Sequence, residues 1–287
     1  MSKEVMIISC NMEIQHFNFA KSFIEKFNND FDIYLIFQSH LGNQNIYTKL
    51  KVFIKRNGFI ELLKRIVCRN IFSKIFLNEQ KKIYEKNYEK VDLNYFYNSL
   101  SKEKVIITND INQINIENLI KKIKPTFFLL QGGKLLKDNI LNALSKTFKL
   151  HLHMGLVPYY RGGNSQFWSI YNNKINENGF TIQSVDLGID TGSIYIRKSI
   201  IDFNEDDNQH TMFIKTHKNG IKAIIDLVSY YQKSKQLPSP ISVKDKGTNY
   251  SGKMMNLCAF EYVYKNRARI FENYTNKNIV YEDLSVI

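Results

Sequence analysis

The sequence predicts an α/β fold with a Rossmann-like, mostly parallel sheet and helices on both faces. Short apolar runs typical of strands alternate with segments whose apolar residues recur at helical spacing. The strand expected at residues 127–131 is almost wholly apolar, as in a strand that is covered on both faces. No repeat, low-complexity tract or Pro/Gly/Ser-rich linker interrupts the alternation. A single layered α/β architecture follows.

The first half of the chain begins as a βαβ unit. The strands expected in this half, in chain order, are residues 5–9, 33–37, 104–108 and 127–131. The helices expected between and after them are residues 17–27, 116–124 and 135–144. His16 lies between the first strand and the first helix, where open α/β sheets tend to bind ligands. A solvent-exposed histidine at a helix start is the alternative interpretation.

Residues 49–90 interrupt this pattern with a basic insertion. It holds twelve Lys or Arg against four Glu, so it carries +8 of the net charge of +13. Its apolar residues fall at helical spacing, which predicts one or two amphipathic helices laid on the parent domain. These residues are Phe59, Leu62, Leu63, Ile66, Val67, Phe72, Ile75 and Phe76. A solvated basic face, an anion-binding surface for phosphate or nucleic acid, and a helix attached to anionic lipid all stay open.

The composition indicates an ordinary globular chain of 287 residues and 33.8 kDa, 44% hydrophobic. Cys10, Cys68 and Cys258 are far apart and odd in number, which indicates neither a disulfide framework nor a metal site. We therefore expect a reducing cytoplasm. No signal peptide or transmembrane helix is expected, because no segment has the required apolar length.

We divide the chain into an α/β domain, residues 1–200, and a C-terminal extension, residues 201–287. The extension opens with an acidic patch at residues 202–207. Apolar stripes then predict helices at residues 211–232 and 257–273. The extension is therefore expected to be small and mainly helical.

The most informative stretch is residues 149–196. Leu150 and Leu152 alternate with His151 and His153, and this period of two puts both imidazoles on one face of a strand. A loop rich in glycine and tyrosine follows, as at the binding rim of a sheet. A second strand starting near Phe180 ends in a turn with the sequence Asp-Leu-Gly-Ile-Asp-Thr-Gly, residues 186–192. The turn places carboxylates at the end of that strand.

These residues resemble the folate-dependent formyltransferases, closest in kind to the sugar N-formyltransferases. Matching positions, in order and spacing, are His153, Gly155, Val157-Pro158, Arg161-Gly162, Trp168, Thr181 and the turn at 186–192. Residues 124–133 resemble the family's core strand and its glycine turn. The resemblance covers roughly residues 105–200 well. One departure matters, because His151 stands where the family has its catalytic Asn.

The resemblance implies roles for particular residues. His153 is expected to be the main general acid/base or electrophile, Asp190 to set its tautomer or hold its charge, and His151 to take the oxyanion role. The residues expected to contact the cosubstrate 10-formyl-tetrahydrofolate are Gln131, Gly132, Gly133, Gly188 and Ile189. Those expected to bind the other substrate are Tyr160, Arg161 and Asn164. Two structural alternatives stay open: Asp190 as a cap of its turn, and Arg161 as a tie for its loop.

The acceptor is inferred by elimination. The C-terminal 87 residues contain no counterpart of the basic β-barrel of methionyl-tRNA formyltransferases, so a tRNA acceptor is not expected. The amine of a nucleotide-linked amino sugar, used in a surface polysaccharide such as lipopolysaccharide, is the expected acceptor. A formyl-folate hydrolase and a non-catalytic formyltransferase-like binding protein are the alternatives. A homodimer and contact with a membrane surface stay open.

Overall fold

The computed structural model describes residues 3–39, 54–55, 58–245, 247–252, 254–272, 274 and 283–287. Its main sheet has eight strands in the order β10-β8-β7-β5-β4-β1-β2-β3. The strands are Glu4–Asn11 (β1), Phe31–Gln38 (β2), Val105–Thr108 (β3), Phe127–Gln131 (β4), Phe148–His153 (β5), Gly179–Ser184 (β7), Ile194–Ser199 (β8) and Leu284–Ser285 (β10). The five strands from β5 to β3 are parallel, and β7, β8 and β10 pair antiparallel. The predicted α/β class is confirmed.

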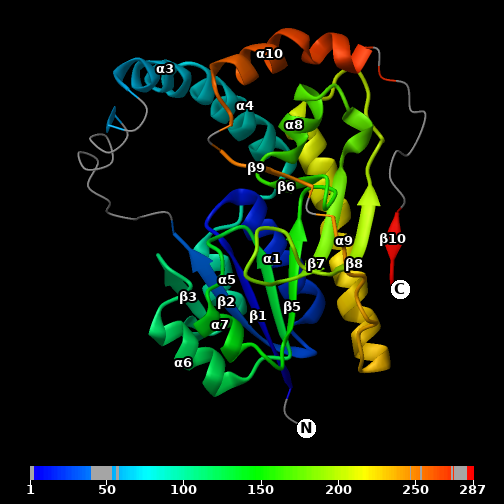
Figure 1. Cartoon of the computed structure of the whole chain (residues 1–287). Coiled ribbons are helices and arrows are strands. Elements are labelled where there is room, and N and C mark those ends of the chain that lie inside the picture. The colour runs from blue at the N-terminus through cyan, green and yellow to red at the C-terminus, as the bar shows by residue number, and fades with distance from the viewer. Residues whose placement is uncertain are drawn as a thin grey trace.

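Helices cover both faces of the sheet, as predicted. They are Ile14–Phe27 (α1), Phe59–Asn70 (α3), Phe72–Asn87 (α4), Leu93–Ser99 (α5), Ile114–Ile123 (α6), Asp138–Ala143 (α7), Ser165–Tyr171 (α8), Gln209–Ser234 (α9) and Leu257–Glu272 (α10). One core lies between the sheet and α1, α5 and α9, and a second core lies on the other face under α6 and α7. Figure 1 shows α3, α4 and α10 above the end of the sheet that holds the carboxyl ends of β1 and β5.

Alternation along the strands explains this division. In β4, Phe127 and Leu129 belong to the first core, whereas Phe128 and Leu130 belong to the second. Successive side chains of a strand point to opposite faces, so a strand buried on both sides must be apolar throughout. The continuous apolar run was therefore a correct signal of a central strand.

Some boundaries differ from the sequence-based expectations. The helix predicted from Leu135 begins only at Asp138, because residues 132–137 form a turn and an extended segment after β4. Two short strands, Tyr160–Gly162 (β6) and Thr248–Tyr250 (β9), pair in a small second sheet that the sequence did not indicate. The C-terminal extension is mainly helical, as predicted, and α9 packs on β5 and β7. The boundary at residue 200 stays a prediction.

The basic insertion contains the two expected helices, α3 and α4, while residues 49–53 and 56–57 lie outside the described part. The expectation that its apolar stripe lies on the parent domain is wrong for α3. Phe59 is 60% exposed and Ile60 71% exposed, and Leu63, Ile66 and Val67 are exposed as well. The reason is that α3 contacts α4 and α10 rather than the sheet. Further along, Phe76 and Tyr84 of α4 are buried.

Candidate active site

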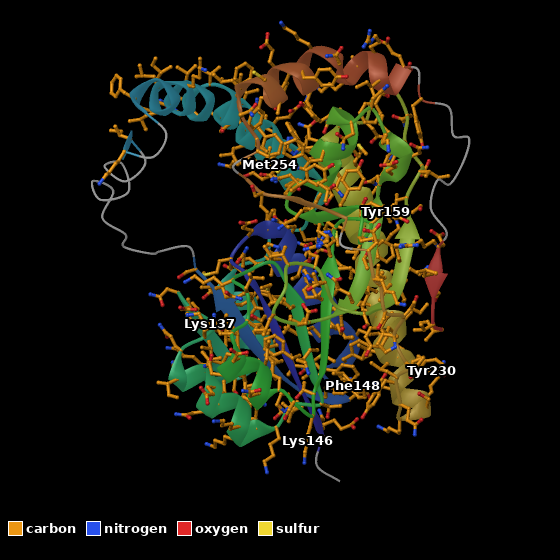
Figure 2. All side chains as sticks on the ribbon, in the orientation of Figure 1. Lys137, Lys146, Phe148, Tyr159, Tyr230 and Met254 are labelled. Carbon is orange, nitrogen blue, oxygen red and sulfur yellow. The ribbon has the colours of Figure 1, made fainter. Side chains whose placement is uncertain are left out.

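Strand β5 presents two histidines on one face, as its alternation predicts. Leu150 and Leu152 are buried in the core shared with α1 and α9. His151 and His153 therefore face the opposite side, and the tilted imidazole centroids are 6.0 Å apart. In Figure 2, Phe148 at the start of β5 lies low in the molecule, whereas Tyr159 in the loop after β5 lies in the upper half. The histidines are thus near the carboxyl end of the sheet.

Asp190 joins the two histidines. Its Oδ1 lies 3.2 Å from His151 Nδ1, and its Oδ2 lies 3.5 Å from His153 Nδ1. The carboxylate also accepts hydrogen bonds from the Gly162 backbone N–H at 2.7 Å and from Gln183 Nε2 at 3.0 Å. We call His151, His153 and Asp190 the histidine–aspartate cluster. The three residues that the sequence analysis predicts to be catalytic therefore lie side by side, and their roles stay predictions.

Asp190 and His153 are buried whereas the His151 side chain is 20% exposed, and burial and charge oppose each other at the two buried groups. Burial alone would raise the pKa of the Asp190 carboxyl, but His153, His151 and the Gly162 N–H together hold that pKa well below its usual range. Burial lowers the pKa of the His153 imidazole, with Asp190 opposing the shift. Asp190 is therefore an anion at neutral pH.

The two histidines differ in the partners of their ring nitrogens. His153 Nε2 lies 2.7 Å from the Tyr160 carbonyl, which can only accept, so this nitrogen carries the proton. The other ring nitrogen of His153 faces Asp190. His151 uses Nδ1 toward Asp190, and no partner for its Nε2 is found among the described residues. His151 is thus the histidine with a ring nitrogen available to a ligand.

The loop after β5 is held in place by the motif residues around it. Thr181 Oγ1 donates to the Gly155 carbonyl at 2.7 Å and accepts from the Val157 backbone N–H at 3.0 Å. A Cβ at Gly155 would lie 2.6 Å from His153 Nε2, which is closer than such contacts occur. Arg161 Nε donates to the Ile189 carbonyl at 2.8 Å and so links this loop to the turn that carries Asp190. These residues position the cluster.

A cavity of about 470 Å³ opens beside the cluster. Most of the residues predicted for binding line it: Gln131, Gly132, Gly133, Asn164, Gly188 and Ile189. His16 also lines it, next to Gly132. Arg161 is not among the lining residues. Tyr160 lies elsewhere, because its ring stacks on Tyr250 and its hydroxyl donates to Glu177 at 2.8 Å.

One wall of the cavity comes from elements that sequence reasoning did not connect with the site. Helices α4 and α9 contribute Phe76, Gln80, Tyr84, Gln209, His210 and Phe213. In the sequence these residues only belong to helical stripes, and a stripe looks the same whether it faces a core or a cavity. Within the described ranges, no group of three or more His, Cys, Asp or Glu side chains is arranged to hold a metal. Likewise, none of the described helices is long and apolar enough to cross a membrane.

Comparison with known proteins places the site in context. The sequence profile of the family described as formyl transferase matches residues 78–228. The methionyl-tRNA formyltransferase of Thermodesulfovibrio yellowstonii is 30% identical over 181 residues, which cover 54% of this chain and 58% of the relative. That of Caldanaerobacter subterraneus is 29% identical over 133 residues, covering 46% and 41%. The chain therefore spans about half the length of the curated relatives it matches.

Solved structures resemble the fold at low identity. An N-formyltransferase from Helicobacter canadensis, solved with folinic acid and dTDP-3-aminofucose, has a TM-score of 0.57 at 16% identity, covering 94% of this chain and 82% of the other. A 4-N formyltransferase from Francisella tularensis has a TM-score of 0.53 at 16% identity, covering 93% and 86%. At this identity the likeness concerns the fold alone.

Proposed function

Because the chain belongs to the formyl transferase family, we propose that it moves a formyl group from 10-formyl-tetrahydrofolate to the amine of a nucleotide-linked amino sugar. The observation that carries this proposal is the histidine–aspartate cluster, which lines a cavity at the carboxyl end of the sheet. A buried carboxylate with two imidazoles suits a reaction in which a side chain takes a proton from the amine and passes it to the leaving nitrogen.

The transfer makes and breaks one bond at the formyl carbon. The amine nitrogen bonds to that carbon, the bond from the carbon to N10 of the folate breaks, and one proton passes from the amine to N10. The free Nε2 of His151 supports assigning this proton to it, because Asp190 contacts the opposite ring nitrogen. After it takes the proton, the imidazolium beside Asp190 carries an Nε2–H that can stabilise the oxyanion or protonate N10.

His153 acts in this scheme through its position. Its Nε2–H is committed to the Tyr160 carbonyl, and its Nδ1 faces Asp190. The ring contacts Asp190 through one nitrogen and holds the loop that starts at Met154 through the other. The sequence-based expectation gave the proton transfer to His153, and the free nitrogen of His151 supports assigning it to His151 instead.

The donor site is proposed where two loops converge on the cluster. Gly132 and Gly133 follow β4 with positive φ angles of 69° and 88°, which favour glycine. Gly188 and Ile189 lie in the turn that ends at Asp190 and line the same cavity. The resemblance assigns this neighbourhood to the folate, and the Helicobacter canadensis neighbour was solved with folinic acid.

An amino sugar is favoured over tRNA as acceptor by the solved structures that resemble this fold. The Helicobacter canadensis neighbour was solved with a nucleotide-linked amino sugar, and the Francisella tularensis neighbour is a 4-N formyltransferase. The curated relatives are nevertheless named methionyl-tRNA formyltransferases, so methionyl-tRNA belongs in the test as a rival acceptor.

The test is a mass-spectrometric screen of the purified protein with 10-formyl-tetrahydrofolate and a panel of nucleotide-linked amino sugars. Methionyl-tRNA and glycinamide ribonucleotide serve as rival amines, and Asp190→Asn serves as the inactive control. We expect one amino sugar to gain one formyl group. Formylation of a rival amine and of no sugar would contradict the acceptor, and formate release without any acceptor would indicate a hydrolase.

A further inference from the structure

Gln131 lies on the face of the sheet opposite to the histidines. Along β4 the side chains alternate between the two cores, and Gln131 follows Leu130, which belongs to the core under α6 and α7. Gln131 also pairs in register with Cys10 of the other core. Leu130 pairs with His151. Since paired residues share a face, Gln131 points toward α1 and α9 and His151 toward α6 and α7.

Both residues nevertheless line the same cavity, which therefore crosses the carboxyl edge of the sheet. The part on the side of α1 and α9, which we call the α1-side chamber, is bounded by Gln131, Gln80, Tyr84 and Phe213. Its place is fixed by packing: Tyr84 and Phe213 cluster with Ile14, the first residue of α1. The histidine–aspartate cluster and the turn at residues 186–191 bound the other side.

The Gln131 amide has no protein partner for its polar atoms. The side chain is 3% exposed, and neither Nε2 nor Oε1 has a hydrogen-bond partner among the described residues. The Oδ1 atom of Asn11, at the end of the neighbouring strand β1, is also without one. A buried amide without partners is costly for the folded protein, so two such groups at one cavity indicate a ligand that supplies the hydrogen bonds.

The named walls of the α1-side chamber offer hydrogen-bonding and apolar surface, while Glu13 and His16 line the same cavity. Gln80 adds a further amide, and Tyr84 and Phe213 add aromatic surface. Tyr84 and Phe213 stack on each other with centroids 5.4 Å apart. Among the described lining residues of the whole cavity, Lys134 after the glycine turn is the only Lys or Arg. Amides with aromatic surface suit a group that both donates and accepts hydrogen bonds and has an apolar face.

We propose that the α1-side chamber holds the sugar ring of the acceptor and that the Gln131 amide binds its hydroxyl groups. This assignment rests on the proposed function. A sugar is the part of such an acceptor that must lie beside the cluster, because it carries the amine. Gln131 and His151 lie on adjacent strands, which are ~4.8 Å apart, so an amine on a ring bound at Gln131 can reach across the edge. In this assignment Gln131 binds the acceptor, whereas the sequence-based expectation placed it at the folate.

The test replaces Gln131 by Met, which has a similar length and no hydrogen-bonding amide. KM is measured for the acceptor and for 10-formyl-tetrahydrofolate, and calorimetry gives Kd for the nucleotide-linked amino sugar and for folinic acid. We expect acceptor KM and Kd to rise roughly tenfold with the donor values within twofold. An acceptor analogue lacking the hydroxyl that Gln131 binds should be affected less by Gln131→Met than the full acceptor.

Two controls separate binding from folding. Gln236→Met makes the same change at an exposed position just beyond the end of α9 that does not line the cavity, and it should change none of these values. The thermal midpoint of Gln131→Met should be unchanged or higher, because the substitution removes an unpaired buried amide. A lower midpoint with unchanged KM values would make Gln131 structural and would overturn the assignment.

The remaining outcomes also decide. A rise confined to the donor KM would return Gln131 to the folate and overturn the assignment while leaving the proposed function intact. Unchanged KM and Kd values in an active, folded variant would also overturn the assignment and leave the proposed function intact. A wild-type protein that formylates no amino sugar would overturn the proposed function itself and this assignment with it. The first two failures appear in the variant and the last in the wild type, so they are distinguishable.

Discussion

Two carboxylates in this protein are each surrounded by a histidine and other polar groups, yet their surroundings differ in kind. Asp190 pairs with His151 and His153. Glu79 of α4 pairs with Arg267 of α10 at 2.9 Å and with His210 of α9 at 3.6 Å. Glu79 also accepts hydrogen bonds from Gln209 and Tyr264. We call these five residues the Glu79 cluster.

The difference lies in the basic side chain that accompanies each carboxylate, which is an arginine at Glu79 and histidines at Asp190. A guanidinium keeps its proton at all ordinary pH values, whereas an imidazole gains and loses one near neutral pH. Burial would raise the pKa of the Glu79 carboxyl, but His210 and Arg267 bring it to about 2. The Glu79 cluster thus holds a fixed charge pair that ties three helices together. The histidine–aspartate cluster can change its protonation, which is what proton transfer requires.

The largest effect should come from Asp190→Asn. An amide still fills the space, but it no longer holds the Nδ1–H of His151, so the ring loses its fixed tautomer and its stabilised imidazolium. By analogy with other acid–histidine pairs, kcat for formyl transfer should fall about 10³-fold or more. Steady-state kinetics with a thermal unfolding control checks this. A folded variant that keeps a tenth of the wild-type kcat would show that Asp190 only caps its turn.

A smaller loss is expected at His151. His151→Ala removes the ring nitrogen that faces the cavity, and kcat should fall about 10²-fold, the usual effect of losing one group that stabilises the transition state. His151→Asn restores an N–H donor of the kind that the resembling family has there, so it should keep more activity than the alanine variant. His153→Ala, measured alongside, decides which histidine transfers the proton. A greater loss in kcat for His153→Ala than for His151→Ala would return that role to His153.

The Glu79 cluster should respond in stability rather than in chemistry. Arg267→Met keeps the apolar stem of the side chain and leaves Glu79 without its fixed cation. Because both side chains are partly exposed, we expect a loss of about 2 kcal/mol in the free energy of unfolding, below the 3–5 kcal/mol of a fully buried pair. Urea unfolding measures it, and kcat should stay within threefold. A hundredfold loss in kcat at unchanged stability would erase the distinction between the two clusters.

Sequence patterns predicted the part of the site that lies on one strand. The common face of His151 and His153 followed from period-two alternation, because strand geometry is local. The meeting of Asp190 with these histidines was reached only through the resemblance, since a turn after another strand can end in many places. Alternation along β4 also contained the information that Gln131 and His151 face opposite ways, but only the register with β5 makes it usable.

The residues that form the wall of the cavity could not be predicted from the sequence. Phe76 and Phe213 belong to apolar stripes that are indistinguishable from core-facing ones. The exposed apolar face of α3 was misjudged for the same reason: its periodicity predicts an amphipathic helix and says nothing about what covers it. The pairing of β6 with β9 joins strands of three residues each, too short for a pattern. These features depend on contacts between distant segments.

The smallest effect concerns His217 of α9, a fully buried histidine that has no carboxylate partner in the described structure. The Tyr88 hydroxyl lies 2.7 Å from its Nδ1, within hydrogen-bond distance. Burial lowers the pKa of His217 to about 3, with the positive groups His16 and Lys218 adding to the shift. An unfolded histidine titrates near pH ~6.5, so below that pH the unfolded chain binds a proton that the folded protein excludes.

This group therefore costs no stability above pH ~6.5, and its destabilising effect grows as the pH falls toward 3. Between pH 6.5 and 5.5 the loss from one such group is about 1 kcal/mol. His217→Gln keeps an acceptor for Tyr88 but does not titrate, so its free energy of unfolding should fall by about that much less over the same interval. Urea unfolding at the two pH values gives the difference. Equal falls in both proteins would show that His217 takes up its proton in the folded state and would contradict the lowered pKa.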